Sequence, residues 1–133
     1  MEPGTILAVV QISAKVLSLI SNYYSGVTKA KADIDRLTKE ISTFHNVLQS
    51  VERAVQHSPG KLPATSVAAI DRSLNYLTSL EEKLNLTSGG KVMKRVGFRA
   101  LKWPFTRKEF EELITKLDRD KATLILALNS DQT

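Results

Sequence analysis

Cysteine is absent from the sequence and histidine occurs only twice. Without cysteine the chain forms no disulfide, no thiolate zinc site and no cysteine nucleophile. His45 and His57 are twelve residues apart on one predicted helix, whereas a helical metal pair needs a spacing of about three or four. The chain also lacks a glycine-rich phosphate loop and a Gly-x-Ser-x-Gly elbow. These absences predict a domain that is no enzyme and holds no metal or cofactor.

Strand signals are also scarce. No long stretch alternates with period two, and no Asn-Gly or Asp-Gly hairpin dipeptide occurs. The six glycines and four prolines help to mark breaks between apolar segments of helical period. The predicted helices cover about 4–24, 28–57, 64–86 and 106–129. We therefore predict an all-α protein, one domain over residues 1–133, folded as an antiparallel four-helix bundle. The connector 91–105 leaves an extra short helix before the last helix as an alternative.

The second segment has the most regular apolar pattern in the chain. Its apolar residues occupy heptad a and d positions: Ile34, Leu37, Ile41, Phe44, Leu48, Val51 and Val55. This face has two interpretations. It forms an internal seam of the bundle, or it binds a partner helix or a second copy of the chain.

Charge is nearly missing from the first segment, where Lys15 is the only charged residue between Pro3 and Thr28. A helix over 4–24 spans about 30 Å, the thickness of a bilayer's hydrocarbon core. Lys15 costs about 2.5–3.5 kcal/mol at the bilayer centre, which disfavours a permanent span. The alternatives are the most buried helix of a bundle and a helix that inserts conditionally. The membrane-insertion candidates are Gly4, Ile6, Leu7, Val10, Lys15, Leu17 and Ile20.

Basic residues are concentrated near the last predicted helix. Seven of the 19 lysines and arginines lie in 91–108, and no Asp or Glu lies there. The rest of the sequence holds 12 basic and 14 acidic residues. These seven residues, the anionic-lipid candidates, are Lys91, Lys94, Arg95, Arg99, Lys102, Arg107 and Lys108. Basic residues interleaved with aromatic anchors, here Trp103 and Phe105, suit an anionic membrane surface. Nucleic acid is a disfavoured partner because no recognised nucleic-acid fold surrounds the patch. A solvated loop whose aromatic residues close the bundle end is the simpler alternative.

The last segment opens with a capping-box pattern from Thr106 to Glu109. Just before it stands the block Leu101, Trp103, Pro104 and Phe105, with Lys102 within it. Together with the nearly uncharged first helix ending in Tyr-Tyr-Ser, this block resembles the HeLo-like N-terminal domain of fungal NOD-like receptors (STAND proteins). The resemblance covers essentially the whole chain. The chain departs from the glycine-zipper pattern of some relatives, since Gly4 is the single glycine within the first helix.

The resemblance implies a signalling domain that precedes further receptor domains and is similar in plan to the HeLo and necroptosis-executioner domains. It implies self-association on activation, release of the first helix and regulated cell death by membrane targeting. The protein would be cytoplasmic at rest and at the plasma membrane when active, with anionic lipids as partners. The alternative is an interaction or autoinhibitory module of the receptor that does not act on membranes.

Overall fold

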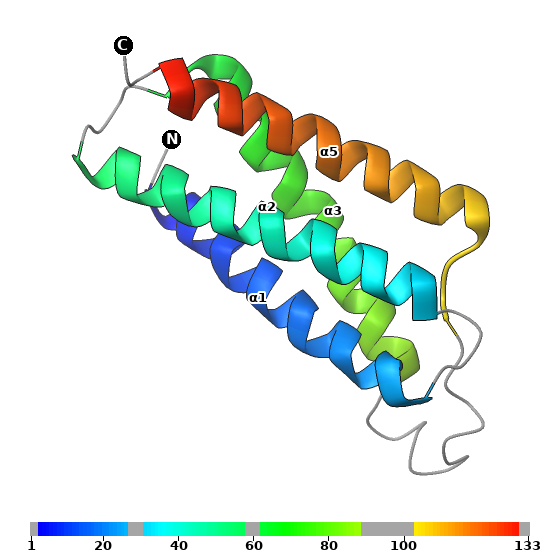
Figure 1. Ribbon diagram of the computed structural model, residues 1–133. Helices are drawn as coiled ribbons and strands as arrows, with labels where there is room; N and C mark the ends of the chain where they lie inside the picture. The colour runs from blue at the N-terminus through cyan, green and yellow to red at the C-terminus, as the bar shows by residue number, and fades with distance from the viewer. Residues whose placement is uncertain (1–2, 27–30, 58–61, 89–102, 131–133) are drawn as a thin grey trace.

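The computed structural model describes residues 3–26, 31–57, 62–88 and 103–130, and within these ranges it is helical with no strand. The helices are α1 (Pro3–Gly26), α2 (Lys31–His57), α3 (Ala64–Ser88) and α5 (Arg107–Ser130). Helix α1 packs against α2 and α3, and α5 packs against the same two helices (Figure 1). The predicted all-α four-helix bundle is therefore confirmed. The predicted short helix in 91–105 falls largely outside the described residues.

The core lies on the shared axis of the four helices. Its largest fully buried side chains are Phe44 of α2 and Phe110 of α5, and every helix adds aliphatic residues. Of the heptad face, Val55 is half-buried and packs against the core, and the other six residues are buried. The heptad face is thus an internal seam, and the alternative of an open partner-binding face is wrong for this conformation.

Two buried serines of the core satisfy their hydroxyl groups within their own helices. Ser13 and Ser73 are buried, and each hydroxyl donates a hydrogen bond at 2.8 Å to the carbonyl three residues earlier in its own helix. Such bonds satisfy a buried hydroxyl within one helix. Both residues therefore occupy core positions that the apolar pattern alone does not mark.

The helix ends extend slightly past the predicted ones. Helix α1 reaches Gly26 and α3 reaches Ser88, each two residues beyond the expected end. Residues that favour a helix end often still belong to the last turn, so an end predicted from sequence differs from the observed end by one or two residues. Helix α5 begins at Arg107 with Thr106 as its N-cap, since Phe110 N donates to Thr106 O at 3.0 Å.

Candidate functional site

Helix α1 is apolar on more of its circumference than the core requires. Ile6, Val9, Val16 and Ile20 are fully buried, and half-buried apolar residues flank them. Leu7 nevertheless exposes 45% of its surface. The window Gly4–Ser21 has a mean hydropathy of 1.7 and is long enough to cross a membrane, although only 33% of its residues are buried in the bundle. A core helix of a soluble protein meets the same length and hydropathy criteria.

Two side-chain contacts add to the apolar packing of α1. Lys15 Nζ lies 2.9 Å from Glu81 Oε1 of α3, with the lysine largely exposed. Ser13 Oγ lies 2.6 Å from His45 Nδ1 of α2. Because the Ser13 hydroxyl gives its hydrogen to Val10 O, it accepts from His45 Nδ1. For the described side chains of α1, over Gly4–Ser21, one exposed ion pair and one hydrogen bond are thus the polar contacts with α2 and α3.

The membrane-insertion candidates do not share one face. Ile6, Val10 and Ile20 are buried in the core, and Leu17 is half-buried against it. The exposed candidates are Gly4, Leu7 and Lys15. In this conformation the most apolar side of α1 is therefore turned inward, and only its outer side is accessible.

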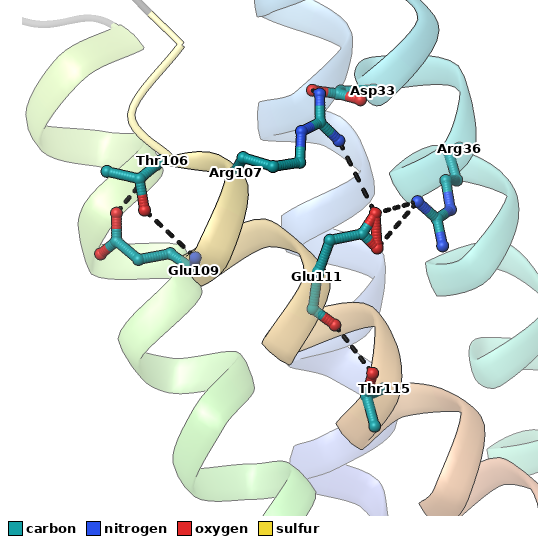
Figure 2. Close-up of polar contacts among 7 residues, drawn as sticks. All are labelled: Asp33, Arg36, Thr106, Arg107, Glu109, Glu111 and Thr115. Carbon is teal, nitrogen blue, oxygen red and sulfur yellow. Dashed lines mark hydrogen bonds and ion pairs between the residues drawn. The ribbon is translucent and has the colours of Figure 1, made fainter.

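The N-terminus of α5 is fixed by polar contacts (Figure 2). The predicted capping box is confirmed: Thr106 N donates to Glu109 Oε1 at 2.9 Å, and Glu109 N donates to Thr106 Oγ1 at 3.1 Å. Lys83 Nζ of α3 lies 2.7 Å from the second carboxylate oxygen of Glu109. The hydrogen bonds from Lys83 and Thr106 lower the pKa of Glu109 to about 2. Glu109 therefore serves as a cap and an interhelical contact.

A second set of charges joins the same turn of α5 to α2. Glu111 accepts two hydrogen bonds from Arg36, at 2.6 and 3.1 Å (Figure 2), and Arg36 lowers the pKa of Glu111. Arg107 donates to Asp33 at 2.8 Å and also lies 3.7 Å from Glu111. Arg107 therefore forms ion pairs with carboxylates of the bundle itself.

The described part of the Trp-Pro block covers one end of the core. Trp103 and Phe105 are half-buried and pack against it, with ring centroids 5.0 Å apart in an edge-to-face arrangement. Phe110 lies 6.2 Å from Trp103 and 6.5 Å from Phe105, measured between ring centroids. This packing agrees with the simpler prediction for these two residues, in which the aromatic side chains close the bundle end. Leu101 lies outside the described residues, and Pro104 is half-buried.

Most of the anionic-lipid candidates lie outside the described residues, namely Lys91, Lys94, Arg95, Arg99 and Lys102. Of the other two, Arg107 contacts Asp33, and Lys108 is exposed on the outer side of α5 beside Glu111 and Glu112. The structure thus brings no patch of these seven residues together within its described part.

Sequence reasoning missed a buried carboxylate between α3 and α5. Asp120 is fully buried, and it accepts hydrogen bonds from Arg72 at 2.8 Å and from Tyr76 at 3.0 Å. Burial and the nearby Asp120 raise the pKa of the Tyr76 hydroxyl, which therefore stays a hydrogen-bond donor. The burial of Asp120 could have been predicted from its position in the sequence. Asp120 falls three residues after Leu117 and four before Leu124, on the apolar face of α5.

A half-buried polar cluster joins α2 to α5. Lys121 Nζ lies 3.1 Å from Glu40 and 3.5 Å from Asp118, and it donates to Thr43 at 3.2 Å. Burial, and then the hydrogen bond with Asp118, raise the pKa of Glu40 although Lys121 opposes this. No three His, Asp or Glu side chains converge in a metal-binding arrangement within the ranges that the structure covers.

The architecture and these contacts define a four-helix bundle with one unusually apolar helix at a corner. Comparison with known proteins adds no family or homologue: no family model, curated protein or solved structure matches the chain.

Proposed function

We propose that this domain is a non-enzymatic effector of a fungal NOD-like receptor that induces regulated cell death by targeting membranes through α1. The observation that supports the proposal is the combination of two properties in α1, its apolar length and its small number of polar contacts. Its window Gly4–Ser21 is apolar and long enough to cross a bilayer, and few polar contacts hold it to the bundle. The resemblance of the Trp-Pro block and the first helix to HeLo-like domains supplies the receptor context.

In the proposed mechanism, clustering of the receptor releases α1 from α2 and α3. Lipid tails then replace the apolar contacts that Ile6, Val9, Val16 and Ile20 make in the bundle. Lysine stems can extend toward the headgroups from near a helix end, but Lys15 lies mid-window, so association of several copies around a wet lumen would shelter its charge. Self-association and anionic lipids are accordingly the proposed partners, and the protein is proposed to be cytoplasmic at rest.

The absence of native cysteine gives a direct test. Val16 and Leu117 are both fully buried, in α1 and in α5. Each is replaced by cysteine in a separate variant, and an environment-sensitive thiol-reactive dye is added to probe whether the thiol is accessible. The domain is clustered by a fused inducible dimeriser and mixed with phosphatidylserine-containing or neutral vesicles. We expect the Val16→Cys thiol to react and its dye to enter an apolar environment with anionic vesicles, while the Leu117→Cys thiol stays protected.

Equal labelling of both positions would indicate unfolding of the whole bundle and would contradict the proposal. Protection of both positions under clustering would favour the alternative, an interaction or autoinhibitory module that does not act on membranes.

A second arm tests lipid contact without disturbing the resting core. Leu7 is 45% exposed and Leu126 of α5 is 69% exposed, so glutamate at either position replaces no buried core side chain. Leu7→Glu should reduce dye leakage from anionic vesicles severalfold, since it places a charge in the inserting helix. Leu126→Glu carries the same change on α5 and should leave leakage unchanged. Equal effects of the two variants would argue against α1 as the inserting helix.

A further inference from the structure

The groove between α3 and α5 contains a cationic section on the side of the bundle away from α1. Its cavity measures about 410 Å³. Three cations line it, together with three polar side chains that carry amide or hydroxyl groups. The lining residues are Arg72, Asn75, Tyr76, Ser79, Lys116 and Arg119. No carboxylate lines this section among the described residues, which sets it apart from the mixed surfaces of α5.

The buried Asp120 positions one of these cations. Asp120 Oδ1 accepts from Arg72 Nη2 at 2.8 Å, and its Oδ2 accepts from the Tyr76 hydroxyl at 3.0 Å. Arg72 remains 47% exposed at its side chain, so its other guanidinium donors face the groove and solvent. A carboxylate that holds a guanidinium from below pre-orients that guanidinium for a second acceptor without neutralising the whole section.

The charge of the section exceeds what Asp120 compensates. Arg119 Nε approaches Asp120 only to 4.0 Å, and Lys116 forms no ion pair with any residue in the described ranges. Arg119 and Lys116 lie three residues apart on α5 and therefore project to the same side of the helix. One carboxylate thus faces three cations within this section, and Glu112, one turn before Lys116 on α5, lies in the adjoining section. The net charge at this opening therefore remains positive.

We propose that this section binds a phosphomonoester. A phosphomonoester near pH 7 carries close to two negative charges and three strong acceptor oxygens, which suits the positive charge and the donors of Arg72, Lys116 and Arg119. The cavity volume lies within the usual range for small-molecule sites, and Asn75 and Ser79 can bond to hydroxyl groups on the ester. Glu112 lines the adjoining section of the groove together with Lys116, so the phosphate is placed at the Arg72 end.

The proposal is independent of the release of α1, because every residue of the site belongs to α3 or α5. The phosphomonoester chemistry has two sources, a soluble metabolite and a lipid headgroup. Glycerol 3-phosphate and vesicles containing phosphatidic acid present the same headgroup in these two forms, so they serve as the two probes.

The experiment compares the double variant Lys116→Gln/Arg119→Gln with the control Lys39→Gln/Arg53→Gln, which removes the same two charge types from exposed positions of α2. Arg72 is kept so that Asp120 stays paired. Binding of glycerol 3-phosphate is followed by amide chemical shifts of the full chain, and binding of phosphatidic acid vesicles by co-sedimentation. Phosphatidylcholine vesicles provide the baseline.

We expect the groove variant to bind at least about tenfold more weakly than the unsubstituted protein, since each lost charged hydrogen bond is worth about tenfold. The α2 control should stay within about twofold. Loss with glycerol 3-phosphate supports a soluble ligand, and loss with vesicles alone supports a lipid headgroup. Equal binding by the groove variant and the α2 control, or no binding of either probe to the unsubstituted protein, would overturn the proposal. Neither result depends on thiol exposure at position 16, so failure here is distinguishable from failure of the proposed function.

Discussion

Helices α1 and α5 occupy equivalent places in the bundle, each against α2 and α3, but they are held by different interactions. Among the described side chains of α1, over Gly4–Ser21, the contacts with α2 and α3 are mostly apolar, with one exposed ion pair at Lys15 and one hydrogen bond between Ser13 and His45. Helix α5 adds ion pairs along its length to its apolar face, with partners on both neighbours: Asp33, Arg36, Glu40, Arg72 and Lys83.

This difference bears on which helix can leave the bundle for a bilayer. Lipid tails are as apolar as the core, so they can replace the contacts of a helix such as α1. They cannot replace charged partners, and ionic groups moved into lipid lose both their partner and water. Under the proposed function, α1 is therefore the helix that would exchange its contacts with lipid, and α5 the helix that would remain.

The largest effect should come from truncating an apolar contact of α1. Ile20 is fully buried, and Ile20→Ala should lower the free energy of unfolding by about 2–5 kcal/mol. Because the lost contact is apolar, the loss measured by urea unfolding should be nearly the same at low salt and in about 1 M NaCl. A loss that shrinks strongly with salt would show that charges, and not apolar packing, hold α1.

A somewhat smaller effect is expected where α5 meets α3. Arg72→Met leaves Asp120 buried with Tyr76 as its close hydrogen-bond donor, so we expect a loss of about 1–3 kcal/mol in the free energy of unfolding. Arg119→Met is the control, since Arg119 lies 4.0 Å from Asp120 and is mostly exposed. Equal losses in the two variants would mean that the hydrogen bond from Arg72 has no special role in holding α5.

The cap of α5 gives a pH-dependent effect. The pKa of Glu109 is lowered from 4.5 to about 2 in the folded protein. A carboxylate with a depressed folded pKa stabilises the fold above its unfolded pKa, and this stabilisation is lost as the pH falls through the folded value. The melting temperature of Glu109→Gln should therefore lie below that of the unsubstituted protein at pH 6, and the two should converge between about pH 4.5 and 2. A constant difference over that range would exclude ionisation of Glu109 as the cause.

Sequence periodicity predicted the helices and the face of α2 because those features depend on local spacing. Ile34, Leu37 and Ile41 recur at helical steps, and burying them requires no knowledge of the partner helix. The capping box was predictable for the same reason, since Thr106 and Glu109 bond to backbone groups of their own turn.

The contacts between helices were not predictable in this way. Asp120 interrupts an apolar face, and its partners Arg72 and Tyr76 come from a helix more than forty residues earlier. Their meeting depends on how α3 and α5 are rotated against each other, which the pattern of one helix does not determine. The hydrogen bond between Ser13 and His45 was likewise not predictable, because the pattern of either helix alone does not show that the two residues meet.

The smallest effect on stability is expected at Lys15, where the comparison between α1 and α5 can be tested most directly. Its ion pair with Glu81 is 58% exposed on the lysine side, so Lys15→Met should change the free energy of unfolding by no more than about 1 kcal/mol. A single α1 that enters lipid before copies associate carries the Lys15 charge at a cost of about 2.5–3.5 kcal/mol near the bilayer centre, and the same substitution removes that cost. The Val16→Cys reporter should therefore enter anionic vesicles at lower lipid concentration when Lys15→Met is added. Lys39→Met on α2 is the matched control and should leave the reporter unchanged. If both lysine variants shift the reporter equally, the gain reflects overall apolarity, and α1 has no special place in membrane entry.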